Sequence, residues 1–232
     1  MVISDYIPDG ATVTPVDDYT IWLRCAELRN TYGSLANVIA NSTAMETLCN
    51  NLNALRYMVR SVEIITPAVL ADNDWITALK ESVYGVSVPT MTSNTKPRGV
   101  ASSDSIYAGY EPYFAFDKSD ARFISALSHG THYLRYQFTT DIWPFAFNIR
   151  NSYATYNAGF KNAKLQGSTN GSTWTDLTEN ILFPTNTTLT EYVVSAENAN
   201  SFDYVQIIGS DAYYADGRVG VTELNIYGLD LS

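Results

Sequence analysis

The segment Lys161–Leu177 constrains the fold of this chain more than any other part of the sequence. Small or apolar residues alternate with polar ones over Asn162–Gly167, which is the period-two pattern of a strand with one buried face. Asn170-Gly171 follows, and this pair is typical of turns between antiparallel strands because both residues tolerate positive φ. Trp174, flanked by threonines, begins a second strand. The segment therefore predicts a β-hairpin.

Short strand patterns continue on both sides of this hairpin. They recur from residue 87 onward at roughly ten-residue spacing, with turn residues between them, and this arrangement is typical of a β-sandwich. The chain is 46% hydrophobic and only 16% charged, which favours a globular protein over a disordered one. We therefore predict a sandwich over residues 87–232.

Several motifs in this region resemble those of the discoidin, or coagulation-factor C-type, domain, which belongs to the galactose-binding-like β-sandwiches. In chain order they are Ala101–Ser103, Tyr110–Asp117, Tyr133–Phe138, the hairpin itself, Phe202–Ile208 and Val219–Gly228. The resemblance covers roughly residues 87–230. It implies an antiparallel jelly-roll sandwich that binds sugars, or in some members lipids or proteins, through loops at one end.

The first 86 residues show a different pattern. Residues 1–18 contain proline, glycine and aspartate turns, which predicts an extended arm that either wraps a neighbour or is free. Residues 19–86 predict about three helices, the last starting at Asp72 or Asn73 and stopping at Gly85. Its predicted apolar face consists of Trp75, Ile76, Leu79 and Val83. The predicted class is thus α+β multidomain, with an arm, a helical domain and a sandwich.

The second predicted helix carries a heptad pattern. Apolar residues alternate at steps of three and four, with one polar position, over Val38, Asn41, Met45, Leu48, Leu52, Leu55, Val59 and Val62. A buried asparagine such as Asn41 often fixes the register of a coiled coil. We interpret residues 19–86 as an attachment and homo-oligomerisation domain; the alternative is a helix packed within its own small domain.

The family resemblance also implies a structural calcium ion beside the Ala-Phe-Asp loop. The corresponding carboxylates here are Asp117, Asp120 and Glu223. Calcium takes six to eight oxygen ligands, and these carboxylates with loop carbonyls can supply them. The sequence departs from the family pattern at Lys118, where glycine is common, and at Phe123, where tryptophan is common. The alternative is a hydrogen-bonded loop in which Lys118 pairs with Asp117 and replaces the ion.

The resemblance further places ligand binding in three loops, Ser103–Tyr110, Arg150–Phe160 and Ser210–Arg218. Aromatic rings stack on the apolar face of a pyranose while polar neighbours bond its hydroxyls. The candidate sugar-binding residues are Tyr107, Tyr110, Asn151, Tyr153, Tyr156, Tyr213, Tyr214 and Arg218. The alternative is that these tyrosines only pack the loops.

Charge and motif content exclude several other functions. The formal net charge is −10, so we expect neither a nucleic-acid partner nor binding to an anionic membrane surface. No stretch approaches the ~20 apolar residues of a membrane span. The sequence contains no nucleophile motif and no phosphate-binding glycine loop, so we predict a non-enzymatic protein. His129 and His132 lack further metal ligands nearby and are interpreted as part of a solvated loop.

The cellular context follows from the start of the sequence and the cysteines. The first residues lack the basic and apolar regions of a signal peptide, and Cys25 and Cys49 lie outside the sandwich, which favours synthesis in a reducing cytoplasm. We interpret the chain as a bacteriophage virion accessory protein, of tail or head fibre or adhesin type, made in the host cytoplasm. It attaches to other virion proteins through residues 1–86 and displays the sandwich to cell-surface glycans. The alternatives are a purely structural virion protein and a carbohydrate-binding module of a bacterial enzyme.

Overall fold

The computed structural model describes residue 50 and residues 73–126, 130–152, 158–185, 188–194 and 200–230. Contacts divide the chain into two units, Met1–Gly85 and Val86–Asp230, which are described separately. The predicted arm, the predicted heptad helix and both cysteines lie outside the described residues. The predictions of attachment and oligomerisation that depend on them therefore stay predictions.

In the first unit the structure describes one helix, α6 (Asn73–Glu81). Three of the four residues predicted for its apolar face are buried: Trp75, Ile76 and Leu79. The fourth, Val83, is 76% exposed because the helix ends before it and the Gly85 N–H donates to the Ser82 carbonyl in a turn. The prediction for Val83 was therefore wrong. No helix in the described part of the chain is long and apolar enough to cross a membrane.

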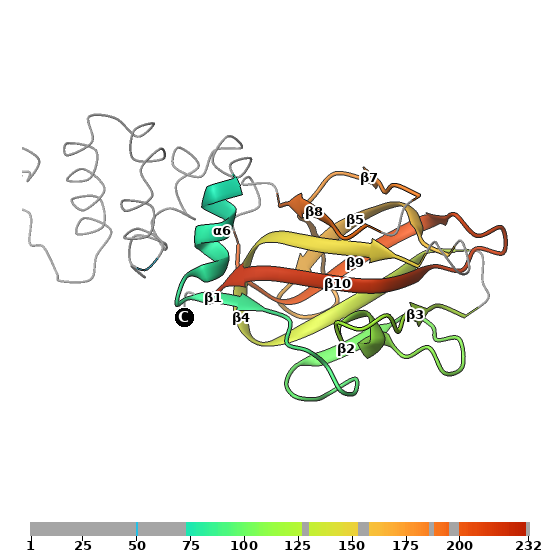
Figure 1. Cartoon of the computed structure of the whole chain (residues 1–232), viewed down its shortest axis with the longest axis horizontal. Coiled ribbons are helices and arrows are strands. Elements are labelled where there is room, and N and C mark those ends of the chain that lie inside the picture. Colours follow the sequence, from blue (N-terminus) through green and yellow to red (C-terminus); the bar gives the residue numbers. More distant parts are fainter. Residues whose placement is uncertain are drawn as a thin grey trace, which may run out of the picture. The chain divides into compact units, whose positions relative to one another are not determined.

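The second unit is an antiparallel β-sandwich, which confirms the fold class predicted for this region (Figure 1). It also contains a short 3-10 helix, η2 (Pro112–Ala115). Its strands are β1 (Gly85–Ser87), β2 (Val100–Ser103), β3 (Phe123–Ile124), β4 (His132–Asn151), β5 (Phe160–Ser168), β6 (Thr175–Asp176), β7 (Ile181–Leu182), β8 (Thr190–Val193), β9 (Phe202–Ala212) and β10 (Gly220–Leu229).

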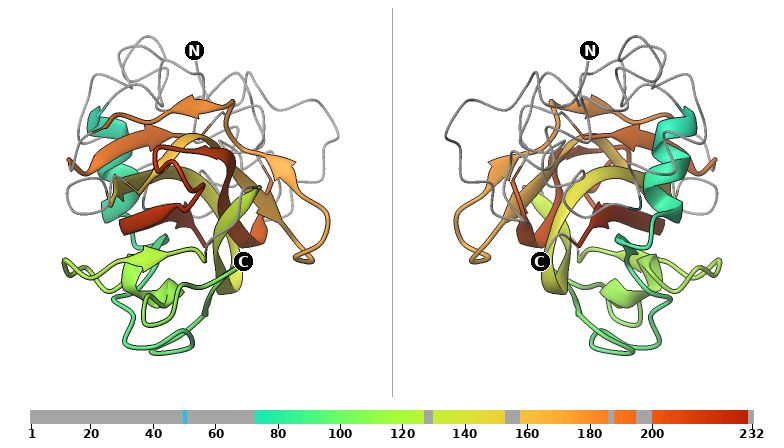
Figure 2. Two further views of the ribbon diagram at one scale, coloured as in Figure 1. Left: turned by 90° about the vertical axis from the view of Figure 1, so that its right-hand side faces the viewer. Right: turned by 90° about the vertical axis from the view of Figure 1, so that its left-hand side faces the viewer.

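Strand β4 belongs to both layers of the sandwich. Its first part, residues 132–137, pairs with β2 and β9, and β9 continues to β5, β6 and β7. Its second part, residues 143–151, pairs with β10 and β8, and β10 also pairs with β1 and β3. The change of partner falls at a register shift between Gln137 and Ile142. Figure 2 shows the two layers along the strands.

The core lies between these layers. Leu134, Tyr136 and Phe138 point inward on β4 and are buried, while the residues between them are partly exposed, which is the alternation of a strand with one buried face. The rings of Tyr136 and Phe138 meet edge to face, with centroids 4.8 Å apart. Burial of each such side chain contributes about 1.5–3 kcal/mol, so this alternation fixes which face of β4 meets the core.

The predicted hairpin is present as β5 and β6, but its turn differs from the prediction. Residues 169–174 connect the strands, and of the pair Asn170-Gly171 only the glycine has positive φ. Asn170 acts instead through its side chain, whose Oδ1 accepts the N–H groups of Ser172 and Thr173, both at 2.8 Å. The Ser168 hydroxyl accepts the N–H groups of Asn170 and Gly171. Side-chain acceptors thus replace the backbone bonds of a two-residue turn.

Candidate functional site

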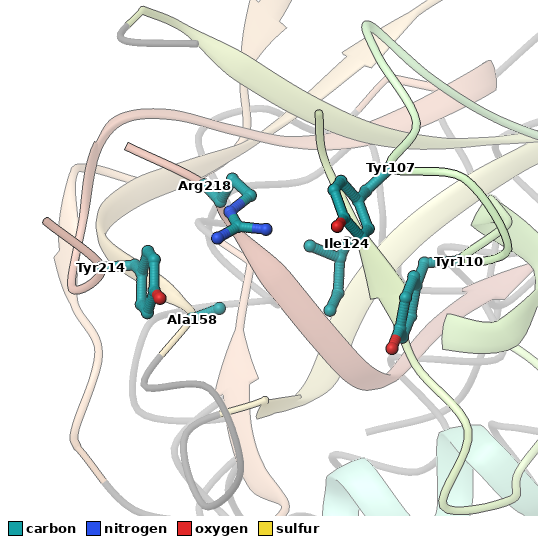
Figure 3. Close-up of a pocket in the computed structure, with 6 residues that line it drawn as sticks. All are labelled: Tyr107, Tyr110, Ile124, Ala158, Tyr214 and Arg218. Atoms are coloured by element: carbon teal, nitrogen blue, oxygen red, sulfur yellow. The ribbon is translucent and has the colours of Figure 1, made fainter. Parts of the chain in front are cut away.

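A pocket of about 280 Å³ lies where three connections meet: β2 to η2, β4 to β5, and β9 to β10 (Figure 3). These connections contain the three loops that the sequence predicted to gather at one end of the sandwich. Its lining residues are Tyr107, Tyr110, Ile124, Ala158, Tyr214 and Arg218. The wall is therefore mostly aromatic and apolar, with one cationic side chain.

The first wall comes from the turn over residues 107–110. The Tyr110 N–H donates to the Tyr107 carbonyl at 2.9 Å, and the Tyr107 N–H donates to the Ile124 carbonyl on β3, also at 2.9 Å. Gly109 closes this turn at a φ of +86°, a conformation that residues with a Cβ seldom adopt. The ring centroids of Tyr107 and Tyr110 end 5.7 Å apart, so the turn presents two adjacent rings.

The second wall comes from residues 213–218, after β9. The Gly217 N–H donates to the Tyr214 carbonyl at 3.0 Å, which turns the chain back toward β10. The Tyr213 N–H donates to the Gly159 carbonyl at 3.1 Å and so joins this loop to the start of β5. Backbone hydrogen bonds therefore hold the loops that carry Tyr214 and Ala158 next to each other.

Arg218 joins the two walls. Its guanidinium carbon lies 5.1 Å from the ring centroid of Tyr107 and 4.9 Å from that of Tyr214. Figure 3 shows Arg218 between the two side chains. Both distances allow cation–π attraction, worth about 0.5–1 kcal/mol each at exposed sites. Asp216 Oδ2 accepts hydrogen bonds from Arg218 Nε at 2.8 Å and Nη2 at 2.7 Å. These bonds raise the pKa of the guanidinium further, so Arg218 is a fixed cation.

Four of the predicted sugar-binding residues meet in this pocket: Tyr107, Tyr110, Tyr214 and Arg218. Two others lie elsewhere. The Tyr213 hydroxyl donates to the Phe183 carbonyl at 2.5 Å, and Asn151 is 5% exposed, with Nδ2 donating to the Phe160 carbonyl at 3.0 Å. Both are engaged in holding the fold. Tyr153 and Tyr156 lie outside the described residues.

The sequence reasoning did not include two lining residues, Ile124 and Ala158. Ile124 lies on β3, a two-residue strand that is too short to show a period. Ala158 lies opposite Ser152 in an isolated bridge at the base of the β4–β5 connection. An alanine carries no chemical signal in a sequence, and only the pairing of the chain brings it to the pocket.

The three carboxylates predicted to bind calcium do not fit a metal site in this arrangement. Arg150 Nη2 lies 3.3 Å from Asp120 Oδ1 and 3.5 Å from Glu223 Oε2, so a guanidinium is placed between two of them. Asp117 Oδ1 accepts the Ser119 N–H at 2.8 Å. Within the described residues, no group of three or more histidine, cysteine, aspartate or glutamate side chains is placed to share a metal ion.

Lys118 also differs from its expected role as the replacement for the ion. It adopts a φ of +56°, which explains why glycine suits this position, and its side chain is exposed. The ion pairs of the described residues include none between Lys118 and Asp117. The positive charge that contacts this loop is therefore that of Arg150 from β4.

His132 is not part of a solvated loop, contrary to the prediction. It is 1% exposed at the start of β4, and its Nδ1 lies 2.8 Å from Asp104 Oδ2. Burial alone would raise the pKa of Asp104, but hydrogen bonds from His132, the Tyr133 N–H and the Ser105 hydroxyl outweigh it and lower the pKa. This pair anchors β2 to β4. His129 lies outside the described residues.

Comparison with known proteins identifies the fold. No family model matches the sequence, and no curated protein matches it. Among solved structures, the family 32 carbohydrate-binding module from C. perfringens NanJ, determined with galactose, is similar at 12% identity and a TM-score of 0.50. The match covers 62% of this chain and 98% of that module. Chitosan-binding module 1 of a chitosanase/glucanase from Paenibacillus sp. IK-5 aligns at 18% identity and a TM-score of 0.48, over 56% of this chain and 95% of the module. The chain thus shares, over 62% of its length, the fold of the module from C. perfringens.

Proposed function

We propose that the sandwich is a non-catalytic carbohydrate-binding module that holds a sugar in the pocket formed by Tyr107, Tyr110, Tyr214 and Arg218. The observation that carries this proposal is a cation fixed between tyrosine rings from two loops. Supporting it is the fold, which a galactose-bound module from C. perfringens shares.

The rings supply the apolar part of recognition. Tyr107 is 42% exposed, and together with Tyr110 and Tyr214 it surrounds a space of about 280 Å³. That size is close to the lower limit of typical ligand pockets, about 300 Å³, and suits a single small ring better than a long chain. The C–H face of a pyranose packs against such rings with little loss of side-chain entropy, because a tyrosine has only two rotatable bonds.

Arg218 supplies the polar part. Its Nε and Nη2 both donate to Asp216, and no hydrogen-bond partner of Nη1 lies among the described residues. The Nη1 donors are therefore available for a sugar hydroxyl. Because Asp216 holds the guanidinium in place, Arg218 loses little freedom when a ligand binds.

The charges around the pocket favour a neutral sugar over an acidic one. The positive charge of Arg218 is balanced by Asp216 within hydrogen-bond distance. The chain as a whole carries a formal charge of −10, which repels anionic ligands at long range. We therefore place uronic and sialic acids behind neutral hexoses in affinity.

For the protein that carries this module, we favour attachment to a bacterial enzyme over a virion. The support is the similarity to the bacterial module, which is matched over 98% of its length. Assembly with other virion proteins through residues 1–86 and homo-oligomerisation depend on residues that the structure does not describe. Light scattering of the full chain tests the oligomer directly, since a monomer at micromolar concentration contradicts the heptad interpretation.

A glycan array probed with the full chain, followed by calorimetric titration of the best ligand, tests the binding proposal. Removing one ring by Tyr214→Ala is expected to weaken binding about tenfold or more, equivalent to about 1.4 kcal/mol. Arg218→Met is expected to lower affinity by a similar factor, because the hydroxyl donor is lost. Neutral sugars are expected to bind more tightly than acidic ones of the same size.

Tyr213→Phe is the matched control for this experiment. It changes the neighbouring tyrosine, which does not line the pocket, and removes only a hydroxyl that donates to the Phe183 carbonyl. This variant is expected to keep its affinity. Folded wild-type protein that binds no glycan, or a Tyr214→Ala variant that binds as well as Tyr213→Phe, would contradict the proposal and favour a sandwich that mediates protein–protein contacts.

A further inference from the structure

The end of β4 brings a positive charge to the place where the family resemblance implies a calcium ion. In the register of β4 and β10, Arg150 and Glu223 are direct partners. The loop over residues 117–120 lies beside this pair, because the Ser119 carbonyl accepts a hydrogen bond from Arg150 Nη2 at 3.3 Å. Three segments that are distant in sequence therefore converge on one guanidinium.

The contacts of Arg150 are those that a metal ion in this position would make. Nη2 lies within 3.5 Å of a loop carboxylate, a loop carbonyl and the Glu223 carboxylate. The guanidinium thus engages three oxygens that could otherwise contribute to the six to eight ligands of a calcium ion. Glu223 Oε1 is engaged as well, since it accepts Asn225 Nδ2 at 2.9 Å.

Burial decides which of these contacts matters most. The side chains of Arg150 and Glu223 are 25% and 15% exposed, whereas Asp120 is 95% exposed. An exposed ion pair contributes little, while breaking a largely buried one leaves a charge without a partner. The Arg150–Glu223 ion pair is therefore the main stabilising contact. Asp120 and the Ser119 carbonyl connect the loop to Arg150 through weaker contacts.

We propose that Arg150 is the built-in cation that ties the loop 117–120 to β10 in place of a calcium ion, so that the sandwich folds and binds without calcium. A divalent ion and the guanidinium cannot share these oxygens, because their positive charges would lie within a few ångströms of each other. Calcium would have to displace Arg150, which is anchored in the strand opposite Glu223.

Thermal melting of the full chain in excess calcium and in chelator tests this proposal. The wild type is expected to melt at the same temperature in both. Arg150→Met, which keeps much of the side-chain length but removes the charge, is expected to lower the melting temperature in chelator by about 2–4 °C. Recovery of that loss by calcium would further support the replacement, since the vacated carboxylates become available to the ion.

Lys118→Met is the matched control, because it also removes one positive charge, from the loop that Arg150 contacts, at an exposed side chain with no ion pair among those of the described residues. It is expected to melt like the wild type. A wild type that calcium stabilises, or an Arg150→Met variant as stable as Lys118→Met, would overturn the proposal. If Arg150→Met does not fold, Glu223→Gln replaces it: a lowered melting temperature supports the tie, and an unchanged one overturns it.

Discussion

Replacing Gly99 by alanine should disrupt the core through one contact that the structure defines closely. Gly99 has a φ of +71°, and a Cβ at this position would overlap the hydroxyl and ring of Tyr136 and approach the Gln137 carbonyl to 2.6 Å. Tyr136 is 1% exposed, and its hydroxyl donates to the Arg98 carbonyl at 2.7 Å. The ring therefore cannot move away without breaking that bond.

Three costs set the expected size of the effect. The left-handed backbone costs about 1–2 kcal/mol for a residue with a Cβ. Overpacking against a buried ring costs about 1–3 kcal/mol, and loss of the tyrosine hydrogen bond costs about 1 kcal/mol. Gly99→Ala should thus lower the free energy of unfolding by about 3–6 kcal/mol, a large share of the stability of a domain of this size.

Gly109→Ala separates the steric cost from the backbone cost. Gly109 has a similar φ of +86°, but a Cβ there would meet nothing within 4 Å. This variant should lose only the backbone part, about 1–2 kcal/mol. Urea unfolding of the full chain, followed by near-ultraviolet circular dichroism, measures both. If the two variants differ by less than about 1 kcal/mol, the packing argument around Tyr136 is refuted.

Three further predictions concern charged groups. The protonated carboxyl of Asp203 donates a hydrogen bond to Asp141, and this bond, then burial and the charge of Asp141, raise the pKa of Asp203 to about 6 from 3.8. The folded state therefore binds the proton more tightly, and the melting temperature should fall as pH rises from about 4 to about 6; Asp203→Asn should remove this slope. Because the pKa of Asp104 is lowered in the folded state, its ionised carboxylate stabilises the fold above pH 3.8, and this stabilisation is lost as pH falls through the lowered pKa. Asp104→Asn should therefore be less stable than the wild type above pH 3.8 and should lack this loss in acid. Asp216→Asn should weaken glycan binding severalfold in calorimetric titration without changing the melting temperature much, because Arg218 is less firmly held.

The sequence predicted the elements whose signal is local. The hairpin at residues 161–177 follows from a period of two, which depends only on neighbouring residues. The motif Tyr133–Phe138 predicted the first part of β4 through its resemblance to the family pattern. The family resemblance indicated the three candidate loops, and their tyrosines are visible in the sequence. Tyr107, Tyr214 and Arg218 were identified in this way, although their distances from each other were not.

The prediction failed where a feature depends on pairing between distant segments. Arg150 lies opposite Glu223 only because β4 and β10 pair in one register, and no pattern around either residue indicates it. The length of β4 was also missed, since the motif Tyr133–Phe138 marks only the part that pairs with β9. Val83 failed for a different reason: its spacing suits the helix, but the helix ends two residues earlier.

The adjacent tyrosines of the β9–β10 connection show why composition alone cannot assign a binding role. Tyr213 is bonded at both ends, through its N–H to the Gly159 carbonyl and through its hydroxyl to the Phe183 carbonyl. The backbone bond joins the loop to the start of β5, and the hydroxyl bond engages the side chain of Tyr213 outside the pocket. The ring of the next residue, Tyr214, lies over Arg218 instead. From the sequence alone, Tyr213 and Tyr214 are equally good candidates for contacting a ligand. Their contacts in the structure distinguish them, and we therefore expect only the substitution of Tyr214 to weaken binding.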